Sequence, residues 1–338
     1  MNKELLAKTA QKIMGHGRGI LAADESTGTI KKRFDQIGVE STEETRNGYR
    51  ELLFTSPDFG QYISGVILYD EQFMAPSSNG QTLRSLIEQA DAVAGIKVDK
   101  GAKDLAGRPG EKITEGLDGL RERLHTYAEL GAGFAKWRAV INIAENIPSR
   151  GALVANAEAL ARYAALCQEA GIVPIVEPEV IMDGTHDIDR CDEVTSETLR
   201  LVYSALADAN VWLEGTLLKP NMVISGTDAA VRANVEEVAS RTVACLKRFV
   251  PAAVPGIVFL SGGQSEQEAT EHLNAMNAMH TLPWGLSFSY GRALQTEALK
   301  SWGGQSANVE KAQEAFIHRA RMNWLAAQGL WSPEQESK

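Results

Sequence analysis

The sequence predicts an α/β fold, a single (β/α)8 TIM barrel with an additional N-terminal helix and a C-terminal helix and tail. Eight short apolar runs, rich in β-branched residues, alternate with longer segments of helical periodicity. Strict alternation of this kind implies parallel strands joined by helical crossovers, and eight repeats spaced by roughly forty residues fit a closed barrel. We expect one domain over residues 1–338, with a mobile tail from about residue 331.

The eight predicted strands place the barrel along the chain. They are expected at Gly19–Ala23, Ile63–Tyr69, Gly95–Val98, Phe134–Ile141, Ile172–Val176, Trp212–Leu218, Gly256–Leu260 and Gly285–Ser289. Asn156–Glu169 and Ala229–Phe249 show helical periodicity, and residues 1–14 are expected to form an amphipathic helix. A doubly wound open sheet is the alternative, but its glycine-rich loop follows the first strand. Here Gly15–Gly19 precedes a strand and is interpreted as a turn, whereas the polar residues 99–114 are expected to form a long βα loop.

Composition and charge exclude several classes of function. The chain is 44% hydrophobic and 23% charged, as packed globular proteins are, and its formal net charge is −10. Nucleic acid or an anionic membrane as the main partner would require a basic surface, so a small anionic ligand held by local cations is the partner that remains. The three cysteines are widely spaced and form no CxxC motif, which indicates unpaired thiols in a reducing compartment. The sequence also shows no signal-peptide core and no apolar stretch long enough to span a membrane. We therefore expect a cytoplasmic protein.

Charged residues interrupt the predicted strands near their C-terminal ends. These residues are Lys97, Asp99, Lys136, Arg138, Glu177, Glu179, Asp24 and Lys219. Residues i and i+2 of a strand share one face, and barrel enzymes keep their catalytic groups at this end. One such charge is equally well explained as a solvated loop residue, but isolated buried charges are costly. Ionisable groups delivered by five strands to the same end therefore predict a mutually compensating cluster in the barrel mouth.

One lysine in this cluster has the surroundings of a nucleophile. Lys219 is flanked by two leucines and a proline, and Lys136 is expected across the barrel. Burial and a second cation both lower the pKa of a lysine, and a neutral amine attacks carbonyl groups. Glu177 and Glu179 are then candidates for the proton transfers that form and dehydrate the carbinolamine. A strand-end lysine whose ammonium group simply reaches solvent is the alternative.

Two regions are candidates for binding phosphate. Glycine-rich turns at Ser261–Ser265 and Ser289–Arg292 follow the seventh and eighth strands, where barrels often hold phosphate through backbone N–H groups and helix N-termini. Residues 26–33, with hydroxyls, a glycine and three cations, could hold a second phosphate together with Lys97. Ordinary turns and an N-capped helix with a solvated basic face are the alternatives.

A metal site is not expected from the histidines. They are His16, His125, His186, His272, His280 and His318. None form a close ligand pair, and neither HxH nor HExxH occurs.

Long segments of the chain closely resemble class I fructose-bisphosphate aldolase. They are GILAADESTGTIKKR, GIKVDKG, GLDGLRERLHTY, FAKWRAVI, AGIVPIVEPE, LEGTLLKPNMV, FLSGGQSE and FSYGRALQ, in this order and spread over nearly the whole sequence. The resemblance implies a metal-independent lyase without a cofactor. It would cleave fructose 1,6-bisphosphate reversibly to dihydroxyacetone phosphate and glyceraldehyde 3-phosphate through a Schiff base, in glycolysis and gluconeogenesis, as a homotetramer.

The resemblance also implies roles for individual residues. Lys219 is the Schiff-base lysine, Glu177 the main general acid and base, Glu179 its supporting partner, and Asp24 and Lys136 complete the core. Asp24 and Glu177 are the candidates for handling the C4 hydroxyl proton. Substrate and phosphate binding is assigned to Arg138, to the ketone-side set Ser261, Gly262, Ser289, Gly291 and Arg292, and to the opposite set Ser26, Thr29, Lys32, Arg33 and Lys97. Thr29 stands where many members have serine, which keeps the hydroxyl.

One departure from the family concerns the C-terminus. Many animal and plant members end in a longer tail that closes with a tyrosine implicated in proton transfer at the enamine carbon. This sequence stops at Lys338 and its last aromatic residue is Trp331, as in a bacterial member. We expect another group to serve that step, or the step to be slower.

Two other functions remain open at this point. A transaldolase-like enzyme would need only one phosphate site, and a non-catalytic phosphosugar-binding scaffold would be expected to lack Lys219 or Glu177. The residues do not fix the preference among fructose 1,6-bisphosphate, fructose 1-phosphate and sedoheptulose 1,7-bisphosphate.

Overall fold

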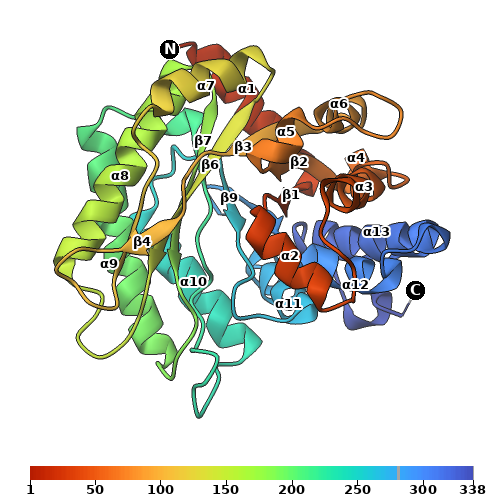
Figure 1. The fold of residues 1–338 in the computed structure, drawn as a ribbon. Helices are drawn as coiled ribbons and strands as arrows, with labels where there is room; N and C mark the ends of the chain where they lie inside the picture. Colours follow the sequence, from red (N-terminus) through yellow and green to blue (C-terminus); the bar gives the residue numbers. More distant parts are fainter. Residues whose placement is uncertain (280–281, 338) are drawn as a thin grey trace.

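A computed structural model describes residues 1–279 and 282–337 and confirms the closed parallel barrel (Figure 1). Around the barrel the strand order is β1-β10-β9-β8-β7-β6-β3-β2, so the open-sheet alternative is wrong. The strands are β1 (Gly19–Ala23), β2 (Ile63–Leu68), β3 (Val93–Lys97), β6 (Phe134–Ile141), β7 (Val173–Val180), β8 (Leu217–Leu218), β9 (Gly256–Phe259) and β10 (Gly285–Tyr290). Eight such repeats give the (β/α)8 fold that the sequence predicts.

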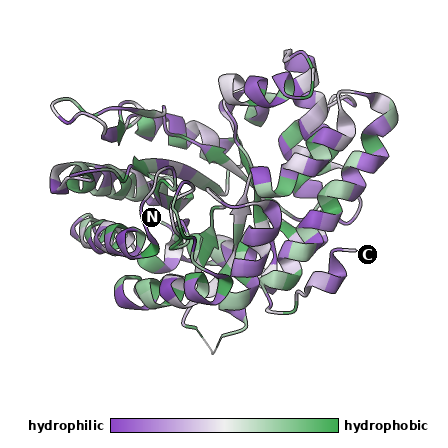
Figure 2. Cartoon of the chain, turned by 90° about the horizontal axis from the view of Figure 1, so that it is seen from below, coloured by the Kyte–Doolittle hydropathy of each residue, from purple (hydrophilic) through white to green (hydrophobic). Residues whose placement is uncertain are grey.

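Helices surround the barrel, and one more helix covers its amino end. They are α1 (Lys3–Met14), α2 (Thr27–Asp35), α3 (Glu43–Phe54), α4 (Phe59–Tyr62), α5 (Asp70–Met74), α6 (Leu83–Gln89), α7 (Leu120–Glu129), α8 (Arg150–Glu169), α9 (Ile188–Asp208), α10 (Val235–Phe249), α11 (Glu266–Asn277), α12 (Arg292–Trp302) and α13 (Val309–Ala326). Figure 2 shows hydrophilic and hydrophobic residues alternating along these helices, as expected when one helix face packs on strands and the other meets water. Among the described residues, no helix is both long enough and apolar enough to cross a membrane.

Four expectations about element boundaries were wrong. Strand β8 is only two residues long, because Leu213–Gly215 forms a 3-10 turn and packs Gly215 against Trp212 and α1. Helix α10 starts at Val235, where the Asn234 side chain accepts a hydrogen bond from the Glu237 N–H and caps the helix. Strand β7 continues to Val180, so its two glutamates lie within the strand and not after it. Residues 99–114 contain an antiparallel hairpin, β4 (Ala102–Asp104) and β5 (Lys112–Thr114), because Glu111 and Asn156 tie its second half to α8.

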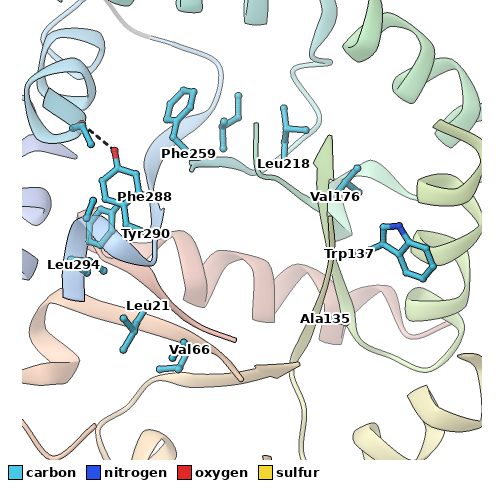
Figure 3. Packing of buried hydrophobic residues seen from close by; sticks show 14 of the residues in the cluster. Leu21, Val66, Ala135, Trp137, Val176, Leu218, Phe259, Phe288, Tyr290 and Leu294 are labelled. Atoms are coloured by element: carbon cyan, nitrogen blue, oxygen red, sulfur yellow. Dashed lines mark hydrogen bonds between the residues drawn. The ribbon is translucent and has the colours of Figure 1, made fainter. Parts of the chain in front are cut away.

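The strands bury two separate apolar layers, one outside the barrel wall and one inside. Figure 3 shows Leu21, Trp137 and Val176 among the outer residues, and a hydrogen bond from the Tyr290 hydroxyl to the Ala269 carbonyl joins this layer to α11. The inner layer is smaller and includes residues of α1. Its buried members are Leu6, Ala10, Ile13, Ile20, Ala22, Ile67, Phe134, Val173, Ile175, Leu217 and Val258. Period-two alternation thus assigns every second residue of a strand to the interior of the barrel.

The C-terminal residues lie against α13 and α11. The Trp331 side chain is buried, and its indole N–H donates to Glu336 Oε1 at 3.0 Å. Glu336 also receives two hydrogen bonds of 2.9 Å from the guanidinium of Arg319.

Candidate active site

A cavity of about 710 Å³ opens at the carboxyl ends of the barrel strands. It is lined by all the predicted catalytic residues and by all the predicted binding residues except Lys32. The predicted residues that line it are Asp24, Ser26, Thr29, Arg33, Lys97, Lys136, Arg138, Glu177, Glu179, Lys219, Ser261, Gly262, Ser289, Gly291 and Arg292. Lys32 lies on α2 with an exposed side chain and does not line the cavity.

Two lysines and two carboxylates meet in the centre of the cavity. Lys136 Nζ, from β6, lies 2.7 Å from Asp24 Oδ2 and 3.4 Å from Glu177 Oε2. Lys219, which directly follows β8, has its Nζ 3.1 Å from Glu177 Oε1. Lys136, Glu177 and Lys219 are each less than 5% exposed. Glu177 therefore lies between the two ammonium groups, one on each of its oxygens.

The two lysines differ in how many carboxylates face them. Burial by itself would lower the pKa of Lys136, but the carboxylates of Asp24 and Glu177 outweigh it and hold this pKa above the ordinary lysine value. Burial would likewise raise the pKa of Asp24, yet the ammonium groups of Lys136 and Lys219 keep it below the ordinary value. Lys136 and Asp24 thus form an ion pair in the resting protein. Among the described residues, Glu177 is the one carboxylate within ion-pair distance of Lys219, so it is the group placed to exchange a proton with that amine.

Glu179 and Arg138 form a second pair next to this centre. They lie on the neighbouring strands β7 and β6, two positions apart in the register, and the Arg138 Nε donates to Glu179 Oε2. The Glu179 carboxylate more than offsets burial and holds the pKa of Arg138 above its ordinary value. Because the arginine side chain is 41% exposed and the glutamate 10%, the guanidinium is the member of the pair that reaches the open cavity.

On the wall expected to face the ketone-side phosphate, the end of β10 and the start of α12 present donors to the cavity. The Ser289 hydroxyl is buried and has no hydrogen-bond partner in the described chain. Helix α12 begins at Arg292 without a side-chain cap, so its first N–H groups are free for an anion. A Cβ on Gly262 would come within 3.3 Å of Glu179 Oε1, so a larger residue there would crowd the glutamate. A buried donor and an open helix N-terminus fit a phosphate group.

On the opposite side, most of the cations already have carboxylate partners. Lys97 Nζ lies 2.6 Å from Asp99 Oδ1, and Arg33 donates to Glu25. Ser26 Oγ and Thr29 Oγ1 lie 3.1 Å apart, in the first turn of α2. Arg33 also approaches the ketone-side loop, because its Nη2 lies 3.9 Å from where a Cβ on Gly291 would be. This side offers hydroxyls and partly neutralised cations.

Sequence reasoning missed Glu25 as a residue of the site. It lines the cavity but directly follows Asp24, so strand alternation placed it on the other face. Asp99 shares a strand face with Lys97, which was the available signal for its role in holding that lysine. The Tyr127 hydroxyl donates to Asp70 at the cavity rim, and nothing in the local sequence pattern marked either residue. Among the described residues, no group of three or more potential metal ligands gathers in one place.

The fold and the cavity define a (β/α)8-barrel enzyme with a lysine–carboxylate centre at its mouth. The family model for class I fructose-bisphosphate aldolase matches residues 5–338. The chain is 58% identical over 332 residues to a probable class 1 fructose-bisphosphate aldolase of Xanthomonas campestris, covering 98% of this chain and 99% of that protein. It is 55% identical over 327 residues to the cytosolic fructose-bisphosphate aldolase 4 of Arabidopsis thaliana, covering 96% and 83%.

A solved structure agrees with these matches. The fructose-bisphosphate aldolase of Plasmodium falciparum, determined in complex with TRAP and a small-molecule inhibitor, superposes with a TM-score of 0.96 at 48% identity, covering 98% of this chain and 96% of that one. The chain belongs to the class I fructose-bisphosphate aldolase family and is a metal-independent aldehyde-lyase.

Proposed function

We propose that Lys219 is the amine that forms the Schiff base in the reversible cleavage of fructose 1,6-bisphosphate to dihydroxyacetone phosphate and glyceraldehyde 3-phosphate. The observation that carries this proposal is the contact of 3.1 Å between Lys219 Nζ and Glu177 Oε1, two buried residues that line the cavity. Lys219 is 4% exposed and lies at the strand end where barrel enzymes hold their reacting groups. Transfer of one proton to the glutamate leaves a neutral nucleophile.

Glu177 serves the proton transfers at the ketone carbon. The neutral amine adds to the C2 ketone, and the carboxyl group returns its proton to the resulting hydroxyl, which leaves as water. The product is a protonated imine that can accept the electron pair of the neighbouring carbon–carbon bond. Lys136 keeps a positive charge beside Glu177, which stabilises the carboxylate at the stage when it has given up its proton.

Asp24 and Glu177 are the bases available for the carbon–carbon cleavage itself. Removal of the C4 hydroxyl proton turns C4 into an aldehyde, and the C3–C4 electron pair moves into the imine to form an enamine. Asp24 is held ionised by Lys136 at 2.7 Å, so it is competent to accept a proton. Protonation of the enamine at C3 and hydrolysis of the imine then release dihydroxyacetone phosphate and regenerate the amine.

The two phosphates are assigned to opposite walls of the cavity. The Ser289 hydroxyl, the free N-terminus of α12 and Arg292 support binding of the phosphate next to the ketone. Ser26, Thr29, Arg33 and Lys97 support binding of the other phosphate. Two basic walls favour a bisphosphate over the single phosphate that a transaldolase requires.

Borohydride reduction in the presence of dihydroxyacetone phosphate, followed by peptide mapping, tests the assignment. We expect a stable adduct on Lys219 and activity that a chelator does not change. An adduct on another side chain, or loss of activity with the chelator, would contradict the proposal. The same reduction without dihydroxyacetone phosphate serves as the control and should leave the lysine unmodified.

We further propose a homotetramer in the cytoplasm. The relatives from Arabidopsis thaliana that are named cytosolic support the location, and the family resemblance supports the oligomer. Light scattering on the purified chain tests the assembly, and a mass of one or two protomers would contradict it.

A further inference from the structure

A buried network extends from the cavity wall at Arg33 and Glu25 to two residues behind that wall, Arg50 and Gln295. Glu25 accepts hydrogen bonds from Arg33 on one carboxylate oxygen and from Arg50 on the other. Gln295 donates to the first oxygen at 3.2 Å and to the Ala22 carbonyl at 2.9 Å, which ties the carboxylate to the end of β1. Arg50 and Gln295 do not line the cavity, and Arg50 comes from α3, which contributes no other residue to the site.

The charges of this network do not cancel. One carboxylate faces two guanidinium groups, so the group of three carries a net charge of about +1 at neutral pH. The side chain of Arg50 is 2% exposed and that of Arg33 is 19% exposed. The surplus positive charge can therefore reach a ligand only through Arg33, which lines the cavity beside Gly291.

We propose that Arg50 is a positioning residue for phosphate binding, acting through Glu25 and Arg33. Arg50 neutralises the buried Glu25 from behind, so that Arg33 is held in place by the carboxylate without losing its net charge toward the substrate. Gln295 fixes the carboxylate in the orientation in which it can serve both arginines at once. This inference rests on the proposed function, in which the cavity binds a sugar phosphate.

Removing the buried cation should weaken substrate binding without harming the chemistry. In Arg50→Met, Glu25 pairs with Arg33 alone and cancels its charge. We expect the KM for fructose 1,6-bisphosphate to rise about tenfold, the size of one charge-assisted hydrogen bond, with kcat changed less than about twofold. The inhibition constant of inorganic phosphate should rise in parallel.

Removing the buried anion as well should restore binding. In the double variant Arg50→Met/Glu25→Gln, neither buried charge remains, the amide oxygen introduced at position 25 can still accept a hydrogen bond from Arg33, and Arg33 keeps its own charge. A buried pair replaced as a whole is tolerated far better than one broken partner, so we expect a KM within about threefold of the unchanged protein. A purely structural role of Arg50 predicts the opposite, because a second core substitution would add damage. A double variant with a KM as high as that of Arg50→Met would overturn the inference.

Two further variants keep the test decisive. Arg46→Met removes an arginine from the same helix, where it pairs with Glu71 at 2.7 Å outside the cavity, and should leave KM unchanged. If Arg50→Met does not fold, the charge-conserving Arg50→Lys replaces it and should bind substrate with a KM within about threefold of normal. A tenfold increase in KM in Arg50→Lys would overturn the inference.

The adduct that borohydride reduction forms on Lys219 is measured in each variant. Absence of this adduct in the unchanged protein would contradict the proposed function. A normal adduct together with an unchanged KM in Arg50→Met would contradict this inference alone.

Discussion

Alternate residues of each strand point into the barrel. Near the amino ends of the strands these residues are apolar, whereas near the carboxyl ends of β6 and β7 they are charged. On β6 the row runs from Phe134 to Lys136 and Arg138, and on β7 it runs from Ile175 to Glu177. Helix α1 covers the amino end with Leu6, Ala10 and Ile13, and in the described part of the chain no such helix covers the cavity at the other end.

Packing at the amino end shows why this end tolerates little change. Phe134 reaches so close to the neighbouring strand that a Cβ on Gly95 would lie 2.3 Å from its ring, and a Cβ on Gly256 would lie 2.4 Å from Met14. At the carboxyl end, by contrast, the buried Ser289 hydroxyl has no hydrogen-bond partner among the described residues, and Glu177 Oε2 has the ion pair with Lys136 at 3.4 Å but no hydrogen bond. The comparison indicates that tight apolar packing at the amino end stabilises the barrel, whereas the carboxyl end keeps polar groups that can bind a ligand.

Loss of the amine should have the largest effect on activity. In Lys219→Met no Schiff base can form, so we expect kcat/KM to fall by more than about ten-thousandfold, with the fold intact because Glu177 still faces Lys136. Steady-state kinetics and circular dichroism measure the two quantities. Lys103→Met, an exposed lysine on the hairpin at the same end, is the matched control and should be fully active. Retained cleavage in Lys219→Met would contradict the mechanism.

The two glutamates of β7 should be unequal. Glu177→Gln removes the carboxylate that touches both lysines, and we expect kcat to fall by about a thousandfold. Glu179→Gln leaves those contacts in place and alters only the partner of Arg138, so the loss should be nearer to tenfold. Rapid-quench kinetics would resolve the step affected. Equal losses in the two variants would show that the roles are shared.

At the amino end, a substitution should lower stability and spare activity. Leu6→Ala removes a fully buried side chain of α1 from the inner layer and should reduce the free energy of unfolding by about 3 kcal/mol. The neighbouring Leu5 is 46% exposed, and Leu5→Ala should change that energy by less than about 0.5 kcal/mol. Chemical denaturation measures both. A drop in kcat for the folded Leu6→Ala protein would show that the two ends are coupled.

Acid should weaken the carboxyl end through a buried histidine. Burial lowers the pKa of His272 to about 4, and the ring contacts Gln264 in the loop after β9 at 2.7 Å. The unfolded chain binds this proton near pH 6.5 and the folded chain only near pH 4, so the stabilisation is complete above pH 6.5 and is lost as pH falls toward 4. We expect a loss of roughly 2 kcal/mol over that range.

The histidine prediction is checked by unfolding at several pH values. His272→Gln should flatten the dependence between pH 4 and 6.5, while His125→Gln, an exposed control, should leave it unchanged. An unchanged slope in His272→Gln would assign the acid sensitivity to other groups.

Much of the site could be predicted because strand alternation is a local rule. Lys136 and Arg138, or Glu177 and Glu179, share a face whatever surrounds them, and the barrel topology puts that face at the mouth. The short β8 could not be predicted, because a contact between Gly215 and α1 replaces strand pairing there. Lys32 was grouped with the phosphate residues by its position in a matching segment, but the helix turns its side chain outward.

By itself, the sequence determined the fold class, the family and the inward rows of charge, since each depends on periodicity or on long matching segments. Only the tertiary structure decided which charge faces which. Lys136 lies between Asp24 and Glu177, Lys219 pairs with Glu177, and Arg50 pairs with Glu25 from behind the cavity wall. These pairings join β1, β6, β7, β8 and α3, which are far apart in the chain. They exist only once the barrel has closed, because ion pairing depends on distances of a few ångströms that no local pattern encodes.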